Sequence, residues 1–310
     1  MASDGTRVMM VDGHALVHRA FHALPEDLST SSGEPTNAVL GFTNIVLKEV
    51  AELRPTHILM AMDRPVPTFR HEKFAAYKAT RPPTPHPLRV QFQRVREVAD
   101  ALNMTIYELD GYEADDVLGT LAGEAERQGL ETVIVTGDLD ALQLVSDHVH
   151  VLTPGRGVSE TTEYDVQAVV ARYDIQPNQL PDWKALVGDT SDNIPGVKGI
   201  GNKGASKLIA QYGNLEGVYA HLDEVPVRQR ELLEAGQQQA FESRELATIV
   251  RDAPVQLDLD ETRYTGGDRA RLIELFRELE FYSLIDRVQG TLPRAASTAP
   301  ARNTRPGDPQ

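Results

Sequence analysis

The sequence has no cysteine among its 310 residues, a single tryptophan and only 6% aromatic residues. The absence of cysteine excludes disulfides, zinc–thiolate sites and a cysteine nucleophile. No apolar run approaches the roughly 20 residues of a membrane span, and the N-terminus lacks a signal-peptide pattern. We therefore expect a soluble cytoplasmic protein without membrane contact. Its 41% hydrophobic content suffices for one large domain or two modest ones.

Basic residues are also in deficit, because 31 Lys and Arg face 46 Asp and Glu for a net charge of −15. Such a balance argues at first against a nucleic-acid partner. The charges are segregated, however: residues 101–150 hold eleven acids and one arginine, whereas residues 64–96 hold eight basic residues and one glutamate. Segregation of this kind favours an acidic metal pocket beside a phosphate-binding segment, although scattered solvated faces would give the same counts.

The first half of the chain alternates short apolar runs with amphipathic stretches. Strands are predicted at Val8–Val11, His57–Met62 and Thr132–Val135, and residues 39–53 and 88–102 carry apolar side chains at helical spacing. This alternation predicts an α/β fold with a central, mostly parallel sheet flanked by helices. From about Asp182 helical patterns prevail, at Ala205–Tyr212, Arg228–Ala235 and Arg269–Leu279.

The chain is thus divided into an α/β core at 1–181, a helical region at 182–288 and a proline-containing tail at 289–310. The tail has no apolar period, which predicts a disordered linker or terminus.

Three predicted strands lead into aspartates, namely Asp12, Asp63 and Asp138, and Asp140 follows two residues later. In an open parallel sheet, ligands bind beyond the carboxyl ends of the strands, so these carboxylates should meet at one edge. A helix N-cap also favours aspartate and would explain any one of them. Three in succession favour a site.

Two further segments add acids to the same set. Glu113, Asp115 and Asp116 begin a predicted helix, where the helix dipole also stabilises them, and Asp189 and Asp192 are spaced by three residues. Nine carboxylates in one pocket require protons or cations. Oxygen ligands without cysteine favour Mg²⁺ or Mn²⁺, and two such ions about 4 Å apart can activate water and stabilise both oxygens of a phosphodiester displacement.

The basic segment at about 64–90 interleaves cations with aromatic rings, a pattern that suits single-stranded nucleic acid. Prolines between residues 82 and 87 predict a mobile connection, and a solvated loop with a few buried rings is the alternative. The histidines at 14, 18 and 22 recur every four residues and are assigned mainly to packing and polar contacts.

Lysines surround a glycine-rich stretch at residues 194–208, which has the pattern of a helix–hairpin–helix. Its glycine spacing also resembles a dinucleotide loop, but no strand leads into it.

Four motifs carry a family resemblance: VDGH at Val11–His14, GYEADD at Gly111–Asp116, TGDLD at Thr136–Asp140 and GDTSDNIPGVKGIG at Gly188–Gly201. As a set they resemble the 5′-nuclease family, closest to the N-terminal 5′→3′ exonuclease domain of bacterial DNA polymerase I, with flap endonucleases and phage 5′ exonucleases as more distant relatives. The resemblance runs from about Arg7 to Val288. It implies a PIN-like or resolvase-like nuclease core, then a DNA-binding region with a helix–hairpin–helix at about 188–212.

The resemblance also implies roles for individual residues. One metal group would be Asp12, Asp63, Glu113, Asp115 and Asp116, and the other Asp138, Asp140, Asp189 and Asp192. The basic segment would form an arch whose Lys78 and Arg81 act on the scissile phosphate. Arg19, which lies outside this segment, would contact the phosphate as well. Other DNA contacts would come from Tyr77, stacking near terminal bases, and from Arg70, Lys73, Lys198, Gly199, Gly201, Lys203 and Lys207. The family hairpin often binds K⁺; its usual Gly-Glu-Lys-Thr-Ala reads Gly-Asn-Lys-Gly-Ala at 201–205, without the threonine hydroxyl.

The implied function is a structure-specific 5′→3′ exonuclease and flap endonuclease that uses two or more Mg²⁺ or Mn²⁺ ions in DNA replication and repair. Its substrates would be DNA with 5′ ends, flaps or nicks, and RNA primers as well. We expect a monomer associated with the bacterial nucleoid. A catalytically silent DNA-binding protein and an RNase of related fold are the alternatives. The chain is either a self-standing exonuclease or the front part of a longer polymerase.

Overall fold

The computed structural model of the chain describes residues 5–155 and 160–291. Within them a six-stranded sheet has the order β3-β2-β1-β4-β5-β6, with every neighbouring pair parallel except β5 and β6. The strands are β1 (Arg7–Asp12), β2 (His57–Ala61), β3 (Thr105–Tyr107), β4 (Glu131–Val135), β5 (Val149–Pro154) and β6 (Thr161–Tyr164). The predicted mostly parallel sheet is confirmed, and β1, β2 and β4 are the three strands predicted from sequence.

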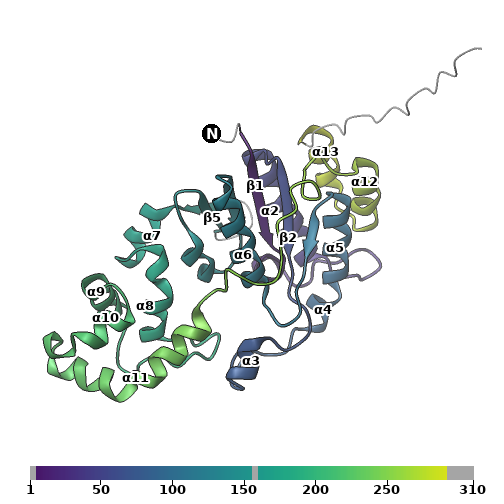
Figure 1. The fold of residues 1–310 in the computed structure, drawn as a ribbon. Coiled ribbons are helices and arrows are strands. Elements are labelled where there is room, and N and C mark those ends of the chain that lie inside the picture. Colours follow the sequence, from purple (N-terminus) through teal and green to yellow (C-terminus); the bar gives the residue numbers. More distant parts are fainter. Residues whose placement is uncertain (1–4, 156–159, 292–310) are drawn as a thin grey trace, which may run out of the picture.

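Helices surround this sheet and form the second part of the chain (Figure 1). Those of the first part are α1 (Gly13–Ala23), α2 (Asn37–Leu53), α3 (Phe69–Lys73), α4 (His86–Arg89), α5 (Gln91–Ala101), α6 (Ala114–Arg127) and the 3₁₀ helix η1 (Leu139–Leu144). The remaining ones are α7 (Val166–Tyr173), η2 (Pro177–Gln179), α8 (Leu180–Val187), α9 (Asn202–Tyr212), α10 (Leu215–Ala220), η3 (Leu222–Glu224), α11 (Val227–Ala247), α12 (Arg269–Glu278) and α13 (Tyr282–Thr291).

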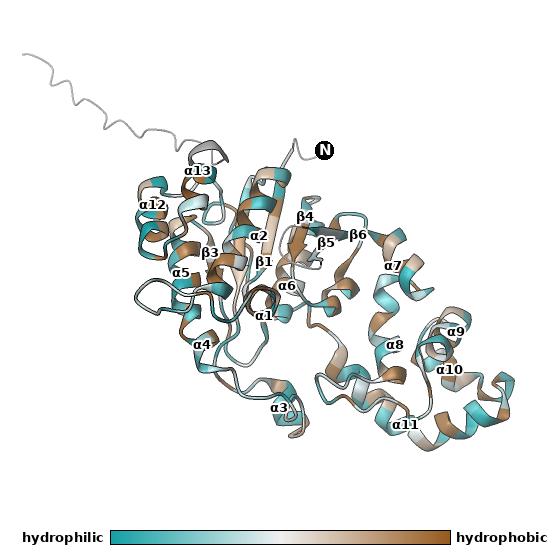
Figure 2. Cartoon of the chain, turned by 180° about the vertical axis from the view of Figure 1, so that it is seen from behind, coloured by the Kyte–Doolittle hydropathy of each residue, from teal (hydrophilic) through white to brown (hydrophobic). Residues whose placement is uncertain are grey.

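Alternation along the central strands divides the core into two apolar layers. In β1, Met9 and Val11 pack with α1, α2 and α5, whereas Val8 and Met10 face the opposite side, where α6 lies. Successive side chains of a strand point to opposite faces, so a strand buried on both faces reads as a continuous apolar run. Figure 2 shows this burial as hydrophobic colour along the central strands, with hydrophilic stretches on the surrounding helices.

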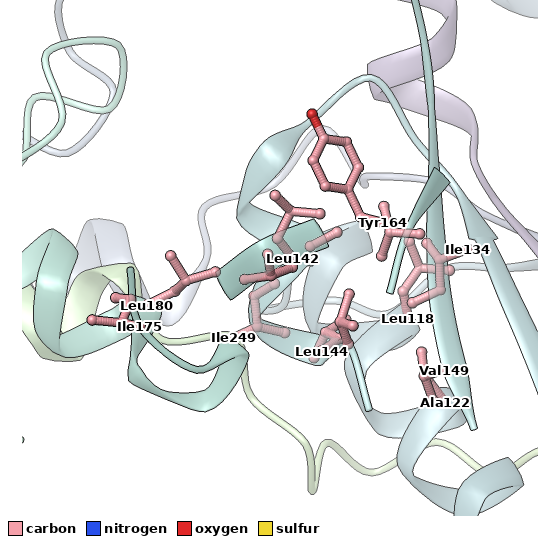
Figure 3. Packing of buried hydrophobic residues seen from close by; sticks show 14 of the residues in the cluster. Leu118, Ala122, Ile134, Leu142, Leu144, Val149, Tyr164, Ile175, Leu180 and Ile249 are labelled. Atoms are coloured by element: carbon pink, nitrogen blue, oxygen red, sulfur yellow. The ribbon is translucent and has the colours of Figure 1, made fainter. Parts of the chain in front are cut away.

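The apolar layer beneath α6 continues into the helical region. In Figure 3, Ile134 and Val149 of the sheet and Leu118 of α6 belong to the same cluster as Ile175, which precedes α8, and Leu180, its first residue. The first and second parts of the chain therefore share one core.

The last two helices return to the first part of the chain. Leu272 and Phe276 of α12 and Leu284 of α13 join the apolar layer formed with α2 and α5. Figure 1 places α12 and α13 beside α5, on the other side of the sheet from α7–α11. The sequence had grouped these helices with the helical region. It had also begun the tail at residue 289, but helix α13 extends to Thr291, and residues 292–310 lie outside the described residues.

The loop after α8 is a tight hairpin in which Asp189 and Ile194 exchange backbone hydrogen bonds of 2.7 and 2.8 Å. Gly188 and Gly196 both have positive φ, and a Cβ on Gly196 would lie 2.3 Å from the Gly188 nitrogen. Only glycine fits such a close approach of two backbones. The loop thereby fixes the position of two acids, Asp189 and Asp192, next to the core.

No helix in residues 5–155 and 160–291 is long and apolar enough to cross a membrane.

Candidate active site

A cavity of about 550 Å³ lies at the carboxyl edge of the parallel strands. Five of the predicted metal-binding acids line it, although they come from four separate chain segments. These are Asp12 at the end of β1, Asp63 after β2, Glu113 and Asp115 at the start of α6, and Asp138 after β4. The sheet therefore gathers acids that lie up to 126 residues apart (138 − 12) in the sequence, as the edge rule for parallel sheets predicts.

Several of these carboxylates also cap helices. Asp12 accepts a 2.9 Å hydrogen bond from the Ala15 nitrogen through Oδ1, and its Oδ2 accepts one of 2.6 Å from the Thr136 hydroxyl. Asp63 Oδ1 accepts a 2.7 Å bond from the nitrogen of Ala114, the first residue of α6. Capping a helix and lining the site are therefore compatible roles for these aspartates, because the capping hydrogen bonds fix the orientation of carboxylates that line the cavity.

Burial makes the charges in this cavity costly. It raises the pKa of Asp12 to about 7, with the charges of Asp63 and Asp138 adding to the effect and hydrogen bonds from Thr136 and Ala15 opposing it. Burial also raises the pKa of Asp115 well above its ordinary value, and Asp12 and Asp138 raise it further. A carboxyl group that is hard to ionise in a site of like charges would gain from a nearby cation.

The donors in the cavity fit a hard divalent cation. Asp115 Oδ1 is buried and has no hydrogen-bond partner within the described part of the chain. An orphaned carboxylate oxygen among other carboxylates is the ligand type that Mg²⁺ or Mn²⁺ takes. In residues 5–155 and 160–291 as they stand, no three acids or histidines converge closely enough to hold an ion.

The other four predicted ligands each lie against a cationic side chain. Lys184 of α8 forms ion pairs with Asp140 and, at 2.6 Å, with Asp189. Burial alone would lower the pKa of Lys184, but these two carboxylates outweigh it and raise the pKa. Asp192 is paired with Arg81. The sequence had not singled out Lys184, since one lysine in an amphipathic helix carries no pattern of its own.

Asp116 is turned away from the cavity and fully buried. Its two oxygens receive bonds of 2.6 and 2.7 Å from the guanidinium of Arg70, which itself is only 2% exposed. Arg70 also donates to the carbonyl oxygens of Leu246 and Thr248 at 2.9 and 2.8 Å. The sequence predicted Asp116 as a metal ligand and Arg70 as a DNA contact. The structure instead joins the two into an ion pair that links α3, α6 and the end of α11.

The predicted arch residues close over the acids. Lys78 Nζ lies 2.8 Å from Glu113 Oε1, and both Lys78 and Arg81 line the cavity. Lys78 has a φ of +55°, and its nitrogen donates to the Asp192 carbonyl at 2.9 Å. Tyr77 was predicted to stack on bases, but it is 3% exposed, and its single hydroxyl proton is shared between carboxylate oxygens of Glu113 and Asp192 at 3.1 and 3.2 Å. A ring held in this way positions carboxylates and offers no stacking face to a base.

Arg19 and the neighbouring histidines line another wall of the cavity. Arg19 donates to the Pro154 and Gly155 carbonyls, and its buried Nε has no partner among the described residues. His14 and His18 pack against Phe92, with ring centroids 4.6 and 6.1 Å away. Burial lowers the pKa of His18 to about 4, so this ring is neutral near pH 7. These contacts agree with the packing role assigned to the histidines.

The predicted hairpin residues lie on a separate surface. Lys198, Lys203 and Lys207 are exposed at and after the loop that joins α8 to α9. Lys203 and Lys207 line a second cavity of about 690 Å³ together with Arg172 and Trp183, neither of which the sequence had singled out. Lys73 is exposed and paired with Glu245. The hairpin therefore presents cations without crowding the acidic cavity.

Metal removal is expected to give an unusual pH dependence of stability. Because the folded pKa of Asp12 is about 7 and its ordinary value is 3.8, the folded state binds more protons than the unfolded state between these values. The contribution of Asp12 to the free energy of unfolding of the metal-free chain should therefore fall as pH rises from 5 to 8, by at least about 1 kcal/mol, and Mg²⁺ should oppose this loss most at pH 8. Urea unfolding with EDTA or Mg²⁺ measures it.

Asp12→Asn is the matched control for that experiment, because it removes the titrating group while keeping its shape. The difference in free energy of unfolding between the wild type and this variant isolates the Asp12 contribution from those of Asp115 and His18. The lowered pKa of Asp189, about 2, acts only in more acid solution. A wild type that becomes more stable relative to metal-free Asp12→Asn between pH 5 and 8 would contradict this electrostatic description.

Comparison with protein families accounts for nearly the whole described chain. Residues 7–174 match the 5′-3′ exonuclease N-terminal resolvase-like domain, and residues 175–270 match the 5′-3′ exonuclease C-terminal SAM fold. An acid-lined cavity at the edge of a resolvase-like sheet, followed by a helical SAM-like part, defines the chain as a nuclease. The chain belongs to the 5′-3′ exonuclease family.

Curated relatives are DNA polymerases I. That of Chloroflexus aurantiacus is 49% identical over 278 residues, covering 88% of this chain and 29% of the relative, and that of Bacillus caldotenax is 44% identical, covering 91% and 32%. The chain therefore spans about a third of the length of these relatives.

Solved structures share the fold at low identity. The T5 5′-exonuclease with bound zinc has a TM-score of 0.61 at 21% identity, covering 89% of this chain and 98% of the other. The catalytic core of Rad2 in complex with DNA substrate has a TM-score of 0.61 at 15% identity and covers 92% of each chain.

Proposed function

We propose that the chain is a structure-specific 5′ nuclease that hydrolyses DNA phosphodiester bonds near 5′ ends and flaps with bound divalent metal ions. The observation that carries this is the cavity in which five carboxylates from four segments meet at the sheet edge. Membership of the 5′-3′ exonuclease family supports the reaction class. The T5 D15 protein has been co-crystallised with metal ions and the catalytic core of Rad2 solved with DNA substrate, which supports the same classes of ligand here.

The cavity acids are the residues proposed to hold Mg²⁺ or Mn²⁺: Asp12, Asp63, Glu113, Asp115 and Asp138. When bound, such ions supply an activated water and neutralise charge on the scissile phosphate. Thr136 keeps Asp12 oriented through its 2.6 Å hydrogen bond. Asp116 then contributes through Arg70, which ties the arch to the start of α6.

Three cations on the cavity wall are proposed to bind the phosphate. Lys78 and Arg81 come from the arch, and Arg19 comes from α1. In the absence of DNA, Lys78 is paired with Glu113 and Arg81 with Asp192. A phosphate oxygen entering the cavity offers both cations a charge-assisted partner, so substrate binding exchanges one set of ion pairs for another.

Duplex DNA is proposed to bind on the hairpin surface. Lys198, Lys203 and Lys207 are exposed, and the described residues hold no ion pair with any of the three. Lysines free of carboxylates can neutralise phosphates, which gives sequence-independent and salt-dependent affinity. The backbone at Gly199 and Gly201 brings DNA close to the start of α9. A K⁺ ion at the hairpin belongs to this proposal, and we expect duplex affinity to fall when Na⁺ replaces K⁺.

Cleavage of a 5′-labelled flap duplex by this chain is the direct test. We expect incision near the flap junction in Mg²⁺ and none in EDTA, with short 5′-phosphorylated products. The same duplex carrying an RNA flap reports primer removal, and the same duplex with the flap on its 3′ end is the matched negative control. Binding without Mg²⁺-dependent incision would point to a silent DNA-binding protein, and incision of RNA alone would point to an RNase.

A further inference from the structure

Lys184 has a place in the site that none of the preceding roles explains. It lies on α8, its side chain is 13% exposed, and its Nζ is 2.6 Å from Asp189 Oδ2. The same ammonium is hydrogen-bonded to both carboxylate oxygens of Asp140. An ammonium group has three protons to donate, and these three oxygens satisfy all of them. Lys184 is therefore a fixed, fully bonded cation between two acids of the predicted second metal group.

Three of the cavity acids lack such a partner, whereas Glu113 is paired with Lys78. Within residues 5–155 and 160–291, no lysine or arginine forms an ion pair with Asp12, Asp115 or Asp138. Asp115 even retains a buried oxygen without a hydrogen bond. Asp12, Asp115 and Asp138 are therefore left without a paired cation, whereas Asp140 and Asp189 share the ammonium of Lys184.

We infer that Lys184 is a positioning residue whose ammonium fills the Asp140–Asp189 half of the cluster, so that the DNA-free chain holds a single divalent ion tightly, among the cavity acids. This inference rests on the proposed metal-dependent function. A second tight ion at Asp140 and Asp189 would have to displace Lys184 and leave its charge partly buried without a partner, which is strongly unfavourable. A DNA phosphate adds negative charge and lowers that barrier, so a second ion binds together with substrate.

Counting bound Mn²⁺ by electron paramagnetic resonance tests this on the whole chain without DNA. We expect one tight ion for the wild type and for Lys184→Arg, and two for Lys184→Met, in which Asp140 and Asp189 lose their cation. Lys48→Met is the matched control, because Lys48 is also partly buried and bridges two acids, Glu49 at 3.1 Å and Glu52 at 3.5 Å. It should leave the count at one.

Asp140→Asn keeps the test decisive if Lys184→Met does not fold. This near-isosteric change should leave the affinity of the single tight ion within about twofold, since Asp140 is bonded to Lys184 and not to that ion. Loss of a direct ligand would weaken binding by at least the 10- to 100-fold typical of disturbing a ligand's support. Two tight ions in the wild type, one ion in a folded Lys184→Met, or a large affinity loss in Asp140→Asn would each overturn the inference. A wild-type chain that binds no Mn²⁺ would instead overturn the proposed function.

Discussion

Replacing Asp115 with asparagine is expected to lower the rate of 5′-flap cleavage by about 10²–10³-fold at saturating Mg²⁺, the scale for losing one electrostatic contact to a transition state. Asp115 combines three features: it lines the cavity, its pKa is raised by burial, and its Oδ1 has no protein partner in the described chain. The change removes a negative charge and keeps the side-chain shape. Single-turnover cleavage of a labelled flap duplex gives the rate.

Stability separates this loss from misfolding. Asp115→Asn removes a buried charge that repels Asp12 and Asp138, so the metal-free variant should unfold at a higher urea concentration than the wild type. Asp110→Asn is the matched control, because Asp110 lies in the loop just before α6 but is exposed and paired with Arg64. It should leave the rate unchanged. An Asp115→Asn chain that cleaves at the wild-type rate would remove this residue from the proposed metal site.

Replacing Arg70 with methionine is expected to destabilise the fold by about 3–5 kcal/mol, the cost of leaving one partner of a buried ion pair alone. The carboxylate of Asp116 would remain buried without its guanidinium, and the Leu246 and Thr248 carbonyls would each lose a hydrogen bond. Urea denaturation followed by circular dichroism measures the loss.

A double variant identifies its origin. Combining Arg70→Met with Asp116→Asn should recover part of the stability, because the stranded charge is gone. Arg271→Met breaks an exposed, solvent-screened pair with Glu274 on α12 and should leave the free energy of unfolding nearly unchanged. Equal losses for Arg70→Met and Arg271→Met would mean that the buried pair contributes little.

Much of the site could be predicted from the sequence, because several of its acids directly follow the strands that position them. Asp12, Asp63 and Asp138 follow apolar runs that form parallel strands, and a parallel sheet brings such ends to one edge. The strands missed are β3, β5 and β6. Strand β5 is largely buried, but His150 and Thr153 interrupt its apolar run. Strand β3 is three half-buried residues, and β6 is an antiparallel edge strand in which two of the four residues are exposed. None of the three has the continuous apolar character that marked β1 and β4.

The sequence could not predict which acidic and basic side chains form ion pairs. Asp116 stands beside Asp115, but consecutive helical residues point about 100° apart, so only one of them faces the cavity. Its partner Arg70 is 46 residues away, and Lys184 is 44 residues from Asp140. Contacts at such separations depend on how helices pack against the sheet. The return of α12 to α5 escaped prediction for the same reason.

The shared apolar layer beneath α6 has a thermodynamic consequence. The boundary between the two family matches, at residues 174 and 175, runs through a cluster that includes Val169, Ile175 and Leu180 together with Ile134 of the sheet. Separating the chain there would expose apolar surface on both pieces, at about 25 cal/mol for each Å². The two matched segments should therefore melt in a single cooperative transition. The acids at the sheet edge and those in the hairpin loop then become ordered together on folding and disordered together on unfolding.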